Sequence, residues 1–168
     1  MLKFRFLVLA ALGAGTATCM NTKTLTASTE PVQRIHDVRT TAYTHTESDH
    51  IVYGTESAQG GDLKYGKVRS AAADWSVYPV GTRFQIEGDS SVYEVDDYGS
   101  ALVGTETIDI YKPTKATMDA WGVRNVVIKV LQWGSFDKSL AILKPREKKA
   151  SHVREMVQKL QRGVTRPT

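Results

Sequence analysis

Short β-strand candidates separated by glycines fill the middle of the chain, and they restrict the possible fold more than any other feature. One helix is expected over Lys115–Trp121, because Thr114 can cap its first turn and Gly122 can end it. Many short strands with one short helix predict an all-β fold, a barrel of six strands, since closure removes exposed sheet edges. The strand candidates are Arg39–His45, Lys67–Ala73, Thr82–Glu87, Ser91–Asp97, Thr107–Tyr111 and Asn125–Trp133.

Two acidic residues interrupt these strands. Asp97 ends one strand candidate, and Asp109 lies inside another between Ile108 and Ile110. Alternation places the two isoleucines on one face and the Asp109 carboxylate on the other. Such an acid is either a solvated residue on the outer face or a placed functional group, and the segment alone leaves both open. The same alternation points Asp96 away from Asp97 and predicts that Asp96 is solvated.

The first 18 residues resemble a secretory signal peptide. Lys3 and Arg5 precede a short apolar run over residues 6–14, and small residues lead to Cys19. As the only cysteine, Cys19 cannot form an internal disulfide. Its position resembles the lipidated cysteine of bacterial lipoproteins, which implies an acyl anchor. Ordinary cleavage near Ala17 is the alternative.

The chain divides into four parts. After the signal peptide (1–18), residues 19–38 are rich in Thr and Ser and are expected to form a flexible tether. The barrel domain is expected over 39–136, and a basic tail follows over 137–168. Because Met20, and not aspartate, follows the cysteine, the lipoprotein resemblance implies an outer-membrane protein that faces the periplasm.

The net charge of +4 does not describe the barrel. Residues 39–136 hold nine Lys/Arg against thirteen Asp/Glu, whereas residues 137–168 hold nine against three. In the tail, an apolar stripe predicts an amphipathic helix over Ser151–Arg162. This stripe could pack on the barrel, pair with another chain or contact an anionic surface. A nucleic-acid partner is not expected, since the signal peptide directs the chain out of the cytosol.

Five sequence blocks occur in a characteristic order: residues 41–43, 72–84, 97–104, 108–111 and 120–124. Together they resemble the 3D domain, a family named for three aspartates that also forms the catalytic double-psi β-barrel of membrane-bound lytic transglycosylase A. The resemblance covers residues 39–134 and places the three aspartates at Asp74, Asp97 and Asp109. That transglycosylase has a second domain that helps to hold the glycan, and none of these residues is expected to supply it.

The resemblance implies a lytic transglycosylase in cell-wall turnover. In this reaction the C6 hydroxyl of the sugar attacks its own anomeric carbon and leaves a 1,6-anhydro product. One carboxyl can therefore serve as acid and then as base, provided that burial or a nearby anion raises its pKa. Asp109 matches that catalytic position, with Asp97 as its like-charge partner. The alternative is a non-catalytic, expansin-like protein that binds cell-wall glycan.

Other residues are assigned to substrate binding. Tyr43 is expected to stack on a sugar face, with Thr41 and Tyr98 in the same groove. Asp74 could contact substrate, but its place before a turn favours a role in bonding backbone N–H groups. Trp121 on the short helix is expected in the core. Tyr53 and Trp75 are further candidates for stacking.

No cofactor and no metal are expected. His45, His50 and Asp49 lie close in sequence, but their spacing fits no standard zinc pattern. The expected partner is the glycan strand of peptidoglycan, with the membrane reached through the lipid on Cys19. The sequence makes no prediction of the oligomeric state.

Overall fold

In a computed structural model of the chain, residues 32–47, 54–163 and 166–167 are described. The predicted signal peptide, the lipidation site Cys19 and most of the predicted tether lie outside the described residues. Asp49, His50 and Tyr53 lie outside them as well. Within the described part of the chain, no helix is long and apolar enough to cross a bilayer.

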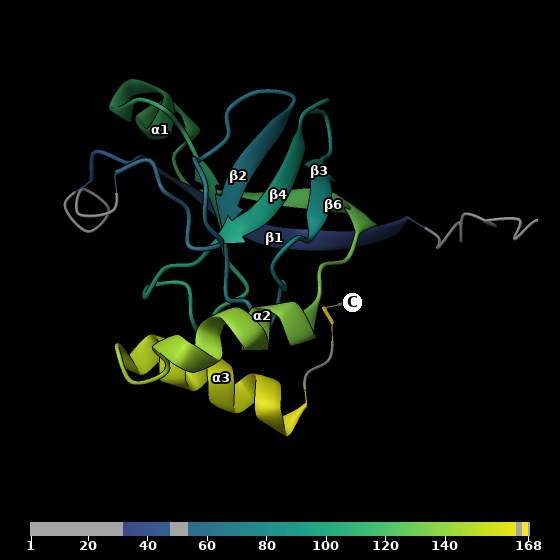
Figure 1. Cartoon of the computed structure of the whole chain (residues 1–168). Helices are drawn as coiled ribbons and strands as arrows, with labels where there is room; N and C mark the ends of the chain where they lie inside the picture. The colour runs from purple at the N-terminus through teal and green to yellow at the C-terminus, as the bar shows by residue number, and fades with distance from the viewer. Residues whose placement is uncertain (1–31, 48–53, 164–165, 168) are drawn as a thin grey trace, which may run out of the picture. The chain divides into compact units, whose positions relative to one another are not determined.

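Six strands close into one barrel in the order β1-β5-β2-β4-β3-β6 (Figure 1). The β1–β5 and β2–β4 pairs are parallel, and the other neighbouring pairs are antiparallel. The closed barrel of six strands confirms the fold that the sequence predicts and is consistent with a double-psi β-barrel. The strands are β1 Gln33–Tyr43, β2 Val68–Ala72, β3 Arg83–Ile86, β4 Val92–Asp97, β5 Ile108–Tyr111 and β6 Arg124–Gln132.

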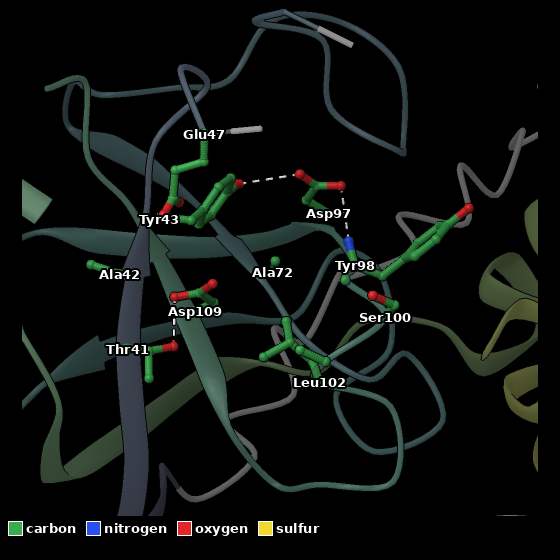
Figure 2. A pocket seen from close by; sticks show the side chains of 12 residues that line it. Thr41, Ala42, Tyr43, Glu47, Ala72, Asp97, Tyr98, Ser100, Leu102 and Asp109 are labelled. Atoms are coloured by element: carbon green, nitrogen blue, oxygen red, sulfur yellow. Dashed lines mark hydrogen bonds between the residues drawn. The ribbon is translucent and has the colours of Figure 1, made fainter. Parts of the chain in front are cut away.

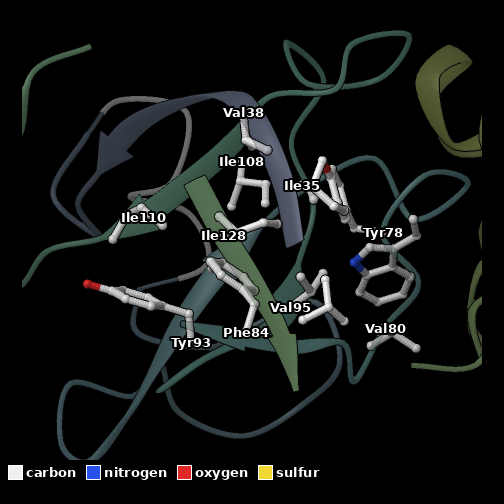
Figure 3. Close-up of a cluster of buried hydrophobic side chains, with 14 of the residues drawn as sticks. Ile35, Val38, Tyr78, Val80, Phe84, Tyr93, Val95, Ile108, Ile110 and Ile128 are labelled. Atoms are coloured by element: carbon white, nitrogen blue, oxygen red, sulfur yellow. The ribbon is translucent and has the colours of Figure 1, made fainter. Parts of the chain in front are cut away.

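All six strands contribute apolar side chains to the interior (Figure 3). Ile108 and Ile110 of β5 are fully buried, and Asp109 between them is only half-buried on the opposite face. Each isoleucine buried in this way contributes about 1.5–3 kcal/mol. Phe84 and Tyr93 stack in the same interior with ring centroids 5.4 Å apart. The apolar alternation in β5 thus directs Asp109 away from the core.

Strand β1 begins at Gln33, earlier than the Arg39 that the sequence predicts. Residues 33–38 are therefore part of the barrel and do not belong to the tether. A bulge explains the difference, because the register with β6 shifts between Ile35 and Val38. Asp37 inside the bulge has a positive φ of 60°, and its carboxylate accepts a hydrogen bond from Asn125. An extra residue breaks the period of two by which a strand is recognised in sequence.

The helix predicted between β5 and β6 is present as α1, Lys115–Trp121. The Thr114 side chain accepts a hydrogen bond from the Thr117 N–H at its start. Gly122, with φ of 59°, ends the helix. Thr114 and Gly122 therefore act as the sequence analysis predicts.

Two further helices pack side by side against the barrel, α2 (Phe136–Leu143) and α3 (Ser151–Arg162), joined by the 3-10 turn η1 (Lys144–Arg146) (Figure 1). The α3 bounds match the prediction, whereas α2 was not anticipated. Val153, Met156 and Val157 of α3 are buried in the same cluster as the barrel residues. The apolar stripe of the tail therefore docks on the barrel.

Gly134 connects β6 to this helical layer at a point of close backbone approach. A Cβ at this position would lie 2.3 Å from the Val80 carbonyl oxygen and 2.4 Å from that of Pro79. No L side chain fits at such distances, so the turn requires glycine.

Candidate functional site

Five of the predicted site residues line one pocket of about 250 Å³ at an end of the barrel (Figure 2). They come from three strands that are distant in sequence, together with the loop that follows β4. The five are Thr41, Tyr43, Asp97, Tyr98 and Asp109. The barrel closure therefore brings together the residues that the sequence assigned to catalysis and to glycan binding, with Asp74 as the exception.

Asp109 is held by a neighbour on the adjacent strand. Thr41 and Asp109 are register partners in the parallel β1–β5 pair. The Thr41 hydroxyl donates a hydrogen bond of 2.6 Å to Oδ1 of Asp109. This bond fixes the orientation of a carboxyl group that is half-buried at the pocket wall. Thr41 is thus placed to position Asp109.

Asp97 is more deeply buried and more heavily bonded, with only 5% of its surface exposed. The backbone N–H groups of Ala58 and Tyr98 donate to Oδ1 at 3.1 and 2.9 Å. The Tyr43 hydroxyl donates to Oδ2 at 3.2 Å (Figure 2). Three donors from three segments hold this carboxylate at the end of β4.

The Tyr43 hydroxyl lies within the electrostatic influence of three aspartates at and near the pocket. Burial raises its pKa well above the usual value for tyrosine, and the charges of Asp97, Asp96 and Asp109 raise it further. The hydroxyl therefore stays protonated and acts as a donor at neutral pH. The influence of both Asp97 and Asp109 on one phenol indicates that the pocket concentrates negative charge.

Tyr98 forms part of the pocket wall where β4 ends. Its ring packs edge-on against the fully buried Trp75, with centroids 5.0 Å apart. Trp75 donates its indole N–H to the Asp97 carbonyl at 2.8 Å. Trp75 therefore belongs to the core that supports the pocket and is not available for stacking on a sugar.

Asp74, which the sequence also offered as a substrate contact, does not line the pocket and is fully buried. Its Oδ1 accepts from the N–H and the hydroxyl of Ser76, and its Oδ2 from the N–H of Gly104. Lys159 of α3 lies 3.4 Å away. These contacts agree with the alternative role, in which Asp74 accepts hydrogen bonds from backbone N–H groups of a turn. The contact with Lys159 also links this turn to α3.

The prediction that Asp96 is solvated is wrong. The register between β2 and β4 shifts so that Ala71 pairs with Val95 and Ala72 with Asp97, which leaves Asp96 as an extra residue. Asp96 is buried, with 1% exposed, and lies 3.1 Å from Lys64. Burial raises its pKa, although hydrogen bonds from Ser70 and Lys64 oppose that effect.

His45 and Trp121, which the sequence analysis also considered, do not line the pocket. His45 bonds to the Tyr111 hydroxyl at 2.8 Å. Trp121 is half-buried at the edge of the core, with the Lys112 and Arg124 cations over its ring. Within the described ranges, no three residues of the His, Cys, Asp and Glu types are arranged to hold a metal ion.

Comparison with known proteins gives one family and two relatives. Residues 69–132 match the family model of the 3D domain. "Cell wall-binding protein YocH" of Bacillus subtilis (strain 168) is 31% identical over 110 residues, 65% of this chain and 37% of that protein. "Putative cell wall shaping protein YabE" of the same organism is 32% identical over 105 residues, 62% of this chain and 25% of that protein. The chain therefore spans well under half the length of either relative.

The family match and the closed barrel of six strands together identify a 3D domain in this chain. The matched residues include all three aspartates on which the resemblance rested, Asp74, Asp97 and Asp109.

Proposed function

We propose that this 3D-domain protein binds glycan strands of the cell wall in the pocket and cleaves them as a lytic transglycosylase. The observation that carries the proposal is the placement of Asp97 and Asp109 in one pocket, on strands β4 and β5. The names of the two relatives, a cell wall-binding and a putative cell wall shaping protein, support the choice of polymer.

The proposed reaction uses Asp109 as the only proton carrier. The protonated carboxyl donates to the glycosidic oxygen as the bond from that oxygen to the anomeric carbon breaks. The C6 hydroxyl oxygen of the same sugar then bonds to the anomeric carbon, and its proton returns to Asp109. Atoms balance without water, and the product carries a 1,6-anhydro ring. Asp109 fits this role because it faces the pocket and is less deeply buried than Asp97.

Asp97 and Tyr43 would support the charge that develops on the sugar. The transition state of glycoside cleavage resembles an oxocarbenium ion, and a fixed carboxylate nearby stabilises it. Three donors hold Asp97 in place, so little reorganisation is needed as the charge appears. Tyr43 offers an aromatic ring at the pocket wall, while its hydroxyl is engaged by Asp97.

A second candidate is binding without cleavage. The printed name of the relative YocH, a cell wall-binding protein, favours it. The same pocket would then hold a glycan strand through the two carboxylates and the tyrosines. The two candidates share a ligand and differ only in whether a covalent bond breaks.

Digestion of purified sacculi distinguishes them. Release of soluble muropeptides that end in a 1,6-anhydro sugar supports lytic cleavage. Release of fragments with reducing ends indicates ordinary hydrolysis and contradicts the proposed chemistry. Sedimentation with sacculi and no soluble product at any enzyme concentration supports the binding candidate.

We also propose that a lipid on Cys19 anchors the protein in the outer membrane, facing the periplasm. The support is the sequence alone, since Cys19 lies outside the described residues. Cys19→Ala is expected to release the protein into the soluble periplasmic fraction. If the variant still sediments with membranes at high salt, the lipid anchor is excluded.

A further inference from the structure

Three basic and two aromatic side chains alternate on the barrel surface beside α1. The Arg69 guanidinium lies 4.7 Å from the ring centroid of Tyr65, and the Lys112 ammonium lies 5.8 Å from the same centroid. Lys112 is also 4.4 Å from the ring of Trp121, over which the Arg124 guanidinium lies at 4.3 Å. We call this series Arg69–Tyr65–Lys112–Trp121–Arg124 the cation–aromatic row.

The row carries more positive charge than its surroundings balance. Asp89 lies 3.9 Å from Arg69 at one end of the row, and among the described residues neither Lys112 nor Arg124 forms an ion pair. Burial lowers the pKa of Lys112, and the charges of Arg69 and Arg124 lower it further, with only Asp89 acting against them. An anion placed here would relieve this repulsion. This local excess of positive charge contrasts with the barrel domain as a whole, which holds more acidic than basic residues.

Packing alone accounts for only part of the arrangement. Arg124 donates to the Trp121 carbonyl, and Lys112 fills the space between two rings, so both help to hold α1. Neutral side chains of similar length could fill the same space without gathering three like charges. Tyr65 remains 41% exposed and Arg124 is exposed, so a ligand can reach the row from solvent.

The row is connected to the pocket by two aromatic contacts. The Tyr65 ring packs edge-on against Tyr111, with centroids 6.4 Å apart. Tyr111 in turn packs against Tyr43 at 5.5 Å, and Tyr43 lines the pocket. A polymer seated in the pocket can therefore bring its side groups to the row, two rings away from Tyr43.

We propose that the cation–aromatic row binds carboxylates of the peptide stems borne by the glycan strand in the pocket. Guanidinium groups pair with carboxylates through two parallel hydrogen bonds, which suits Arg69 and Arg124. Tyr65 and Trp121 cover apolar parts of the stem between the charges. The inference rests on the proposed glycan-binding function and adds that the protein prefers strands that carry stems.

The test compares binding to two polymers. Both are sacculi from which phosphate-containing polymers have been extracted, and one is also treated with an amidase that removes the stems. The Asp109→Asn protein is used as the background so that the glycan is not consumed. The variant adds Arg69→Gln and Arg124→Gln, and the matched control adds Lys115→Gln, an exposed lysine of α1 that pairs within its own helix.

The background protein is expected to bind stem-bearing sacculi more tightly than stem-free strands. Each lost contact is expected to weaken stem-bearing binding about two- to fivefold, the range of an exposed ion pair, without changing binding to stem-free strands. The Lys115→Gln control should keep the full preference, and thermal melting should show all variants folded.

Other results overturn the inference in distinguishable ways. Equal binding of the background protein to both polymers refutes the stem site but leaves the proposed function intact. If neither the Asp109→Asn protein nor the wild-type protein binds either polymer, the proposed function itself is refuted. If the double-arginine variant loses binding to both polymers equally, the row supports the fold or the pocket and does not bind stems. A preference that appears only before phosphate extraction identifies a phosphate polymer as the anion, which contradicts a peptide-stem site.

Discussion

Asp109 at the pocket and Asp74 beneath the tail belong to the same set of three family aspartates, yet their surroundings differ in every respect. Asp109 is half-buried, faces a pocket and receives a hydrogen bond from one threonine hydroxyl of the neighbouring strand. Asp74 is fully buried and bonds to Ser76, Gly104 and Lys159, which lie on three different segments. One aspartate lines a pocket, and the other is enclosed by hydrogen bonds and an ion pair within the fold.

A shared motif therefore does not imply shared surroundings in the fold. Asp97 lies between the two extremes, because it lines the pocket and is also held by three donors. A carboxylate with many internal donors is restricted in orientation, and its loss leaves several donors without acceptors. Access to the pocket therefore separates Asp97 and Asp109 from Asp74, although all three belong to the same motif.

The largest expected effect is on cleavage by Asp109→Asn. The amide has nearly the shape of the carboxyl but cannot give and retake a proton. General acid–base catalysis contributes about 10²–10⁴-fold, so the release of anhydro-muropeptides should fall by about that factor. The variant should stay folded in thermal melting, because the amide oxygen can still accept the hydrogen bond from the Thr41 hydroxyl. A folded variant that cleaves at the wild-type rate would exclude Asp109 as the acid.

The next largest effect is on the stability of Asp74→Asn. An amide offers one acceptor oxygen, so a donor among Ser76, Gly104 and Lys159 must lose its partner in a fully buried site. The free energy of unfolding should fall by about 2–4 kcal/mol, measured by urea denaturation. Lys159→Gln is the matched control and should cost less than about 1 kcal/mol, since it removes a long contact to Asp74 and an exposed pair with Glu155. Equal losses in the two variants would contradict the account of this turn.

A smaller effect is expected for Thr41→Val, which removes the donor to Asp109 and keeps the shape of the side chain. A hydrogen bond to a carboxyl group contributes about 1.5 kcal/mol, so cleavage should fall about tenfold with little change in stability. Thr41→Ser keeps the hydroxyl and should restore most of the rate. Failure of the serine to restore it would assign Thr41 to packing and not to the positioning of Asp109.

The smallest effect concerns Glu94, a third kind of acid that is buried on β4 beneath Lys64 and Arg83. Burial acts to raise its pKa, but hydrogen bonds from Lys64 and Arg83 outweigh burial and lower it. The folded state therefore binds this proton less tightly than the unfolded state does. The stabilisation is present above the unfolded pKa and is lost as the pH falls through the folded pKa.

Glu94→Gln should thus cost about 1 kcal/mol at pH 7 and progressively less in acid, where the wild-type residue is also protonated. The measurement is urea denaturation at a series of pH values. Glu87→Gln is the control, because Glu87 pairs with Arg34 on the surface with 46% of its side chain exposed. A cost for Glu94→Gln that is constant with pH would show that packing, and not charge, determines it.

Much of the barrel could be predicted from the sequence, because its strands follow the simple alternation of buried and exposed residues. The predictions failed where that alternation is interrupted. The bulge at Asp37 hid the start of β1, and Asp96, at the register shift of β4, is covered by Lys64 and Ser70. A bulge adds one residue without leaving a distinct composition, so the pattern alone could not reveal it.

Residues that line the pocket could be predicted from the sequence, but the contacts that hold the surrounding chain could not. Asp97, Asp109 and Tyr43 were found through the family resemblance, and barrel closure brings them together. The burial of Asp74 depends on a tail helix distant in sequence, and no local pattern reports that contact. Helix α2 did carry a signal in Ser135, whose side chain accepts from the Lys138 N–H, and this cap could have been recognised.

The most direct test of the contrast between the pocket and the Asp74 turn is a two-dimensional ¹⁵N NMR titration of the Asp109→Asn protein with a short glycan strand. The account predicts shifts of the Ala58 and Tyr98 amide signals, whose N–H groups bond to Asp97, as glycan is added. The Ser76 and Gly104 amide signals, which report on Asp74, should stay in place. Shifts at Ser76 and Gly104 with none at Ala58 and Tyr98 would contradict the account.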